Sequence, residues 1–246
     1  MKLDKHFINH LTTARNIGVM TGAGISADSG IATFRGKDGL WNNIPVEKVA
    51  TLEGFLENPE LVWKFYDMRR IEISKAKPNH AHLTLKELED FYQVSIITQN
   101  IDGFHKLAGS SNIIELHGNI WEVRCMETGK VSNNTEAPLT TIPPKSETGS
   151  LLRPNVIWFG EALPQKALDL SLKIASESDI FIVIGTSAAV QPAASIPMIA
   201  KRANAFLVEI NIEETQITRF TDLFLKGKAV KVLPELIKEI KKIKGK

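Results

Sequence analysis

A short apolar run that passes directly into a glycine-rich turn is the feature that most constrains the fold of this chain. Residues 16–20 predict a buried strand, and the turn Thr21-Gly-Ala-Gly-Ile-Ser-Ala27 follows at its end. Gly22, Gly24 and Ala27 fit the dinucleotide-binding fingerprint: a tight turn, a close approach of the backbone to a pyrophosphate, and a helix that directs its N–H groups at the anion. The acidic residue that the fingerprint expects about twenty residues later is absent. A glycine turn that binds nothing therefore stays an alternative.

Polar side chains follow two further apolar runs, which also predict buried strands. The run at 94–98 ends in Gln99, Asn100 and Asp102, and a second short run ends in His117. In an open parallel α/β sheet, the carboxyl ends of neighbouring strands border one crevice. We therefore expect these amide, carboxylate and imidazole groups around one pocket.

Each of these side chains also has an ordinary structural interpretation. Asp102 could cap a short helix at 103–107 that Gly109 closes. His117 could be a loop histidine without a chemical role. The glycine turn upstream favours the functional interpretation, because both features belong at the same edge of a parallel sheet.

Composition describes an ordinary globular protein. The 246 residues are enough for a full hydrophobic core, with 43% apolar and 24% charged residues. A net charge of +2 gives no argument for nucleic-acid binding. The single cysteine suits a reducing compartment, and neither a signal peptide nor a membrane-spanning run is evident. We expect a cytoplasmic protein that binds neither nucleic acid nor membrane.

The remaining segments complete an α/β pattern. Helices are expected at 6–15, over most of 45–82, from Pro78 to Asp90 and at 168–176, and buried strands at 179–185 and 205–210. His80 and His82 are expected at a helix start and not as metal ligands, because residues two apart do not share a helix face. The basic amphipathic tail at 233–246 is expected to close the domain, the alternative being a membrane or nucleic-acid surface.

Five motifs resemble the sirtuin family and occur in that family's order. They are GAGISADSGIATFRG at 22–36, TQNID at 98–102, HG at 117–118, VIWFGE at 156–161 and GTSAAVQPA at 185–193. The resemblance extends from about Asn16 to the C-terminus and implies a single NAD-dependent protein deacylase domain over 1–246. It further implies a Rossmann-like parallel sheet (about 1–36, 85–120 and 155–246) with a smaller inserted module (about 37–84 and 121–154), which has a helical part and a ribbon-like part.

The resemblance implies an NAD site in the cleft between these two parts. Asn100 and Asp102 would orient the ribose and the carboxamide of NAD, Gln99 would lie near the ribose hydroxyls, and Arg35 near the phosphates. The loop at 31–41, with Phe34, would close over the site as a lid. The expected NAD-binding residues are Gly22, Ala23, Gly24, Ile25, Ala27, Thr33, Phe34, Arg35, Trp41, Gln99, Asn100, Ile101, Asp102, Gly185, Thr186, Ser187, Asn211, Ile212, Glu213 and Ala229.

The resemblance also implies an extended acyl-lysine peptide as substrate, paired by its main chain with a strand at 156–161 and flanked by 190–192 on the other side. Ala50, Tyr66 and Arg69 match the desuccinylase-like class III branch of the family. Tyr66 and Arg69 share a helix face and together could hold a terminal carboxylate, with Ala50 leaving room for a longer acyl chain. A solvated helix face, on which Arg70 is equally close to Tyr66, is the alternative. The expected substrate-binding residues are Ala50, Tyr66, Arg69, Val156, Trp158, Phe159, Gly160, Glu161 and Val190.

The chain departs from the family at its zinc site. Sirtuins usually carry two C-x-x-C pairs, but here the corresponding positions read Cys125-Met-Glu-Thr128 and Lys145-Ser-Glu-Thr148. A closed structural zinc site needs four ligands. We therefore predict no zinc, a loose loop at 133–150, and Cys125 as a small, partly buried hydrophobic residue.

In the mechanism that the resemblance implies, NAD is consumed. His117 and Asn100 are the catalytic residues, with His117 as the general base, and the products are deacylated lysine, nicotinamide and O-acyl-ADP-ribose. The unperturbed pKa of histidine suits this role. We expect a monomer that removes succinyl, malonyl and acetyl groups. Protein ADP-ribosyl transfer at the same site and a non-catalytic NAD- or acyl-lysine-binding module stay open, and a conventional dehydrogenase is the least favoured.

Overall fold

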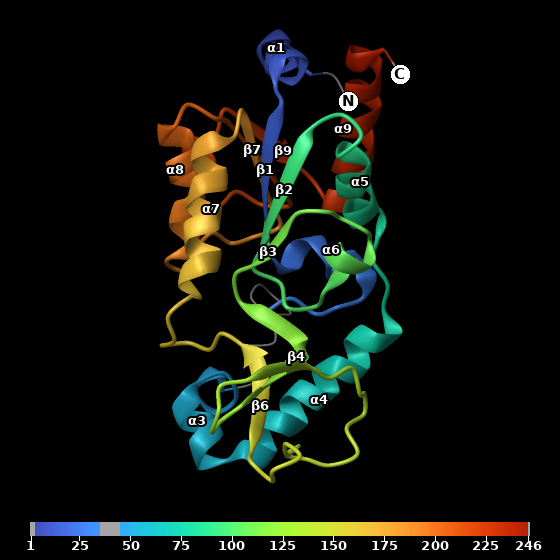
Figure 1. The fold of residues 1–246 in the computed structure, drawn as a ribbon. Helices are drawn as coiled ribbons and strands as arrows, with labels where there is room; N and C mark the ends of the chain where they lie inside the picture. The colour runs from blue at the N-terminus through green and yellow to red at the C-terminus, as the bar shows by residue number, and fades with distance from the viewer. Residues whose placement is uncertain (1–2, 35–44, 246) are drawn as a thin grey trace.

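The structure is a computed structural model that describes residues 3–34 and 45–245. It has a larger part built on a six-stranded sheet and a smaller part built on a three-stranded sheet and helices, which lies at the lower end of the molecule in Figure 1. Both chain ends lie at the opposite end, on the larger part (Figure 1).

The larger sheet is parallel throughout, in the order β3-β2-β1-β7-β8-β9. Its strands are β1 Asn16–Thr21, β2 Gln93–Thr98, β3 Ile113–Glu115, β7 Ile180–Ile184, β8 Phe206–Asn211 and β9 Leu223–Lys226. The order reverses direction between β1 and β7. In open α/β sheets, this switch point is where ligands bind, outside the carboxyl ends of the strands. The predicted Rossmann-like α/β fold is confirmed.

Helices cover both faces of this sheet (Figure 1). One face carries α1 Lys5–Thr13, α5 His80–Leu88 and α9 Ala229–Lys244, and the other carries α7 Gln165–Glu177 and α8 Ile196–Arg202. The apolar stripe of α9 joins the core through Leu233, Leu236, Ile237 and Ile240. The tail therefore closes the domain, as predicted. The start of α5 is also confirmed, because Asn79 and His82 form a reciprocal capping box there.

The smaller part has its own hydrophobic core. Three helices, α2 Val46–Val49, α3 Leu52–Glu57 and α4 Pro59–Lys75, pack against a sheet of β5 Val131–Asn133, β4 Gly118–Cys125 and β6 Leu152–Val156. A short helix, α6 Phe104–Leu107, follows β2. The predicted loop after β5 has no helix but is held in place: Leu139 is buried, and its N–H donates to Asp67 Oδ1 at 2.8 Å.

Two local expectations are wrong. Two 3₁₀ turns, Ala23–Ile25 and Ala27–Ser29, follow β1 in place of the helix of the fingerprint. The Asn79 side chain donates to the Ile25 carbonyl at 2.8 Å, a carbonyl that a helix would need for its own ladder.

The strand expected at 156–161 is also wrong, since β6 begins at Leu152 and ends at Val156, the first residue of the expected range. Beyond it the chain turns at Gly160, where φ is +86°, and Glu161 Oε2 accepts the Trp158 N–H at 2.8 Å. This local hydrogen bond replaces sheet pairing with a turn.

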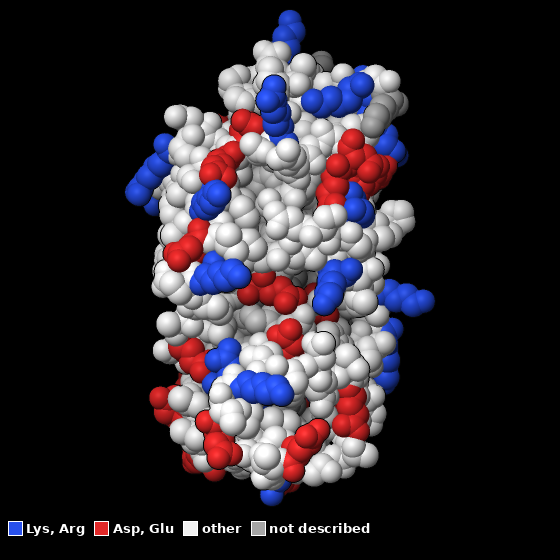
Figure 2. Space-filling view, in the orientation of Figure 1, with Lys and Arg blue, Asp and Glu red and all other residues white. Residues whose placement is uncertain are grey.

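No helix among the described residues has both the length and the apolar character needed to cross a membrane. On the face drawn in Figure 2, acidic and basic side chains of the described residues are interspersed over both parts, in keeping with the net charge of +2.

Candidate active site

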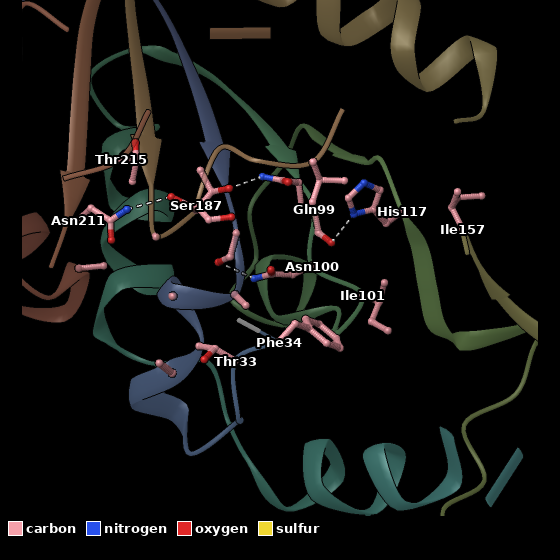
Figure 3. A pocket seen from close by; sticks show the side chains of 18 of the residues that line it. Thr33, Phe34, Gln99, Asn100, Ile101, His117, Ile157, Ser187, Asn211 and Thr215 are labelled. Atoms are coloured by element: carbon pink, nitrogen blue, oxygen red, sulfur yellow. Dashed lines mark hydrogen bonds between the residues drawn. The ribbon is translucent and has the colours of Figure 1, made fainter. Parts of the chain in front are cut away.

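A cavity of about 1080 Å³ lies at the carboxyl ends of β1, β2, β7 and β8 and extends to the smaller part. Figure 3 shows polar side chains from these strand ends lining it, with the His117 ring pointing toward Gln99. Its position is the switch point of the sheet, where a ligand is expected.

Glycines form the floor of this cavity because two backbones meet there. A Cβ on Gly24 would lie 2.7 Å from Gly185 Cα, and a Cβ on Gly22 would lie 2.7 Å from Thr186 Cβ. The Gly24 N–H donates to the Gly185 carbonyl at 2.8 Å. The backbone φ of Gly22 is −128°, which suits any residue. The close approach, and not the tight turn that the fingerprint suggests, therefore requires glycine at this position.

Asn100 is fixed from several sides beside this floor. Its N–H donates to Thr98 Oγ1 at 3.0 Å, and its side-chain amide donates to the Gly22 carbonyl and to Ser26 Oγ, both at 3.2 Å. Ser26 in turn donates to Asp102 Oδ2 at 2.7 Å. These bonds leave the Asn100 amide with one orientation at the edge of the cavity.

Asp102 lies behind Asn100 and does not line the cavity. Its Oδ1 accepts the Phe104 N–H at 2.9 Å at the start of α6. The N-cap residue of this helix is Gly103, so the expectation that Asp102 is the N-cap is wrong by one position. Burial raises the pKa of this carboxyl, opposed by its hydrogen bonds from Phe104 and Ser26.

His117 is oriented by a backbone carbonyl (Figure 3). Its Nδ1 lies 3.0 Å from the Gln99 carbonyl oxygen. Because a carbonyl only accepts, Nδ1 carries the proton, and Nε2 is left as a proton acceptor. Burial lowers the pKa of His117, opposed by the hydrogen bond to Gln99. The ring is therefore a neutral base at pH 7, at the junction of the two sheets.

The smaller part contributes three buried residues to the wall of the cavity, Ala50, Tyr66 and Trp158. Trp158 Nε1 donates to Tyr66 Oη at 2.9 Å. The Phe159 N–H donates to the Ala50 carbonyl at 2.9 Å, which joins the segment after β6 to the helical part.

Arg69 does not line the cavity. Its guanidinium donates to Glu72 Oε2 at 2.6 Å and to the Ala32 carbonyl at 3.3 Å, and it lies 5.7 Å from the centre of the Phe34 ring. Burial lowers the pKa of Arg69, opposed by Glu72. The Arg69 guanidinium thus contacts Ala32 and Phe34, two residues at the start of the predicted lid.

Residues that follow β8 border another part of the cavity. Asn211 donates to the Thr186 carbonyl at 2.9 Å, and buried Glu209 accepts the hydroxyls of Thr215 and Thr218 at 2.7 and 2.5 Å. An ion pair between Lys228 and Asp28, 2.8 Å long, spans the rim.

The structure brings most of the predicted site residues to one cavity. Of the described ones, Ile25, Asp102 and Arg69 do not line it, and Arg35 and Trp41 lie outside the described residues. The lining residues that the sequence analysis missed include Asp28, Leu163, Glu214, Thr215 and Gln216. The last three follow directly after Glu213, so the strand-end argument extended along the loop after β8 would have found them.

The family's zinc ligands are not matched here. Cys125 is buried, and Thr128, Lys145 and Thr148 supply no further thiolate or imidazole. Among the residues that the structure describes, no group of three or more His, Cys, Asp or Glu could hold a metal ion. Backbone hydrogen bonds join the two arms of this ribbon instead, for example from the Met126 N–H to the Leu151 carbonyl at 3.0 Å.

A doubly wound parallel sheet with a glycine-floored crevice at its switch point defines a dinucleotide-binding α/β protein. The model of the Sir2 family matches residues 22–192. The chain belongs to the Sir2 family, which confirms the resemblance to sirtuins.

Relatives and solved structures cover nearly the whole chain. An NAD-dependent protein deacylase of Aquifex aeolicus is 53% identical over 216 residues, 87% of this chain and 90% of its own. An NAD-dependent protein deacylase of Pyrococcus abyssi is 48% identical over 95% of this chain and 96% of its own. A mutant Sir2 homologue in complex with ADP-ribose superposes with a TM-score of 0.95 at 42% identity, over 99% of this chain and 98% of its own. A Sir2 homologue in complex with NAD superposes with a TM-score of 0.91 at 43% identity, over 98% of this chain and 95% of its own.

Proposed function

We propose that this chain is an NAD-dependent protein-lysine deacylase that removes succinyl and malonyl groups as well as acetyl groups. The products would be nicotinamide and O-acyl-ADP-ribose. The relatives named NAD-dependent protein deacylase and the neighbours bound to NAD and ADP-ribose support the general activity. The observation that carries the proposal is the position of His117, which lines the same cavity as the glycine floor and Tyr66 and whose Nε2 has no hydrogen-bond partner among the described residues.

The glycine floor fits a dinucleotide, because the missing Cβ atoms let a pyrophosphate approach the backbone after β1. When bound, NAD would supply an electrophilic ribose carbon as its nicotinamide leaves. With NAD bound, Asn100 would hold the ribose end through its fixed amide, and His117 Nε2 would act as the base toward a ribose hydroxyl. Phe34 and Ile101, which line the cavity, would help to exclude water from the reacting carbon.

Two observations support extended acyl-lysine peptides as substrates. Val156 and Val190, from the two segments expected to flank the peptide, both line the cavity, and a Sir2 structure with a p53 peptide and NAD superposes with a TM-score of 0.85 at 34% identity. We propose that the chain works on such peptides as a monomer. The single cysteine supports a cytoplasmic, reducing location.

The acyl preference rests on Ala50, Tyr66 and Arg69. Ala50 leaves space at the end of the pocket, and Tyr66 presents a buried hydroxyl there. Two of the five N–H donors of Arg69 are bonded to Glu72 and Ala32. Arg69 does not line the cavity but lies within electrostatic range of Tyr66, which does. A carboxylate at the end of an acyl chain that extends past Tyr66 would share this guanidinium with Glu72 and accept charge-assisted hydrogen bonds.

The decisive experiment is turnover of matched acetyl, malonyl and succinyl peptides with and without NAD, followed by nicotinamide release and mass spectrometry of the peptide. We expect NAD-dependent loss of the acyl group. ADP-ribose on an acceptor without acyl loss would instead identify an ADP-ribosyltransferase, and no nicotinamide release with any acyl peptide would identify a binding module.

Two substitutions test the proposed acyl preference. Tyr66→Phe and Arg69→Met are expected to raise the KM for the succinyl peptide by about tenfold or more, since hydrogen bonds to a charged group are worth about 1.5–3 kcal/mol. Acetyl turnover should change little. The matched control is Tyr92→Phe, because Tyr92 donates to the Leu11 carbonyl far from the cavity. Equal losses on both peptides would contradict the carboxylate site.

A further inference from the structure

We propose that Trp158 is a positioning residue that sets the acyl preference by fixing the direction in which the Tyr66 hydroxyl donates. The inference rests on the proposed function, because it concerns the same acyl pocket. It assigns to Trp158 a role through Tyr66, distinct from the peptide contact that the family resemblance implies.

The direction follows from the chemistry of the two side chains. An indole N–H donates and cannot accept, so Tyr66 Oη receives the Trp158 N–H at 2.9 Å on one of its lone pairs. The hydroxyl hydrogen of Tyr66 must then point elsewhere. Among the described residues, none accepts a hydrogen bond from it, and Tyr66 lines the cavity. The hydroxyl therefore offers a donor to whatever group occupies the acyl pocket.

Burial keeps this donor protonated. It raises the pKa of Tyr66 above its ordinary value of 10, against the opposing effects of Trp158 and Arg153. A neutral phenol, and not a phenolate, is the form that can bind an acceptor on the acyl chain.

Trp158 is itself held so that its ring cannot turn. The guanidinium of Arg153 lies 3.6 Å from the centre of the indole ring. Arg153 binds Glu161 through two hydrogen bonds of 2.6 and 2.8 Å, and Glu161 also accepts the backbone N–H of Trp158. Phe55 packs on the ring at 5.2 Å between centroids. The indole N–H thus has one direction available, toward Tyr66.

Acyl groups respond differently to a donor fixed in this way. A succinyl or malonyl group ends in a carboxylate, which accepts a strong, charge-assisted hydrogen bond from the Tyr66 hydroxyl. An acetyl group ends in a methyl group, which accepts nothing. The chain from Arg153 through Trp158 to Tyr66 therefore affects binding of acidic acyl groups and leaves the acetyl reaction almost unchanged.

The test is Trp158→Phe, which removes the indole N–H and keeps an aromatic ring. We expect the ratio of the succinyl KM to the acetyl KM to rise about fivefold relative to wild type, within the range of one neutral hydrogen bond. The matched control is Trp63→Phe, since buried Trp63 donates to the Leu152 carbonyl at 2.7 Å and does not line the cavity. A fall in activity that is equal for both peptides would overturn the inference.

A double-mutant cycle tests the route through Tyr66. In a Tyr66→Phe background, Trp158→Phe should have no further effect on the succinyl KM, whereas additive effects would overturn the inference. If Trp158→Phe does not fold, Glu161→Gln weakens the same set of contacts at Arg153 and should raise the ratio of the succinyl KM to the acetyl KM about twofold. Peptide binding by calorimetry repeats the comparison without turnover. A wild type that binds succinyl peptide through Trp158 but never releases nicotinamide would refute the proposed function alone.

Discussion

The fully buried histidine of α6 makes the stability of this chain sensitive to acid. His105 is 2% exposed, and its Nε2 lies 2.9 Å from Thr21 Oγ1. Because Thr21 donates its own hydrogen to Thr98, the His105 Nε2 must carry the proton of this bond. Its Nδ1 is buried without a partner among the described residues. Burial, with a smaller contribution from the neighbouring His82 ring, lowers the pKa of His105 to about 3.

The magnitude follows from linkage. The unfolded chain takes up a proton on this histidine below about pH 6.5, whereas the folded chain does not until its pKa of about 3 is reached. The folded pKa is the lower one, so stability is present above pH 6.5 and is lost as the pH falls. The loss approaches about 1.4 kcal/mol per pH unit, or about 2 kcal/mol between pH 7 and pH 5. A typical domain has a free energy of unfolding of about 5–15 kcal/mol, so this loss is measurable.

The assay compares wild type with His105→Gln by urea unfolding at pH 7.0, 6.0 and 5.0. Glutamine keeps an N–H donor for Thr21 but does not titrate. The two proteins can differ in their free energy of unfolding at pH 7. Between pH 7 and pH 5, the free energy of unfolding of the variant should rise by about 2 kcal/mol relative to that of wild type. His82, Asp102 and the other titrating groups are common to both proteins and cancel to a first approximation. His80→Gln, at the exposed start of α5, is the matched control for loss of an imidazole. Unfolding free energies that stay parallel for His105→Gln and wild type would refute the reasoning.

Three further predictions concern the site and the smaller part. Gly24→Ala should cost about 1–3 kcal/mol of stability and weaken NAD binding by calorimetry, because its Cβ would lie 2.7 Å from Gly185 Cα. Gly109→Ala, at φ +87° in open space, should cost only about 1–2 kcal/mol and leave NAD binding unchanged, and an equal effect on NAD binding would contradict the close-approach argument. On the acid side, kcat/KM should begin to decrease only below pH 6.5, because burial lowers the pKa of His117 and the base works unprotonated. An acid-side decrease that begins above pH 6.5 would argue against His117 as the base. A chelator should leave the thermal unfolding midpoint unchanged, and a clear drop would reveal a structural metal at Cys125.

Local patterns in the sequence were sufficient for the elements and for the chemistry at their ends. The buried runs predicted β1, β2, β7 and β8, because β-branched and apolar residues without polar interruption specify strands buried on both faces. The motif residues Asn100 and His117 followed from the rule that parallel strands end at a common edge. These inferences need only neighbours in the chain.

Contacts between distant parts of the chain decided the rest. The helix of the fingerprint gave way to 3₁₀ turns because Asn79, from the segment before α5, takes the Ile25 carbonyl. The carboxyl of Asp102 lies behind the cavity, where it binds Ser26. The hydrogen bond from Trp158 to Tyr66 joins residues 92 positions apart. No periodicity or motif specifies such pairs, because they form only when folding packs segments that are distant in the sequence against one another.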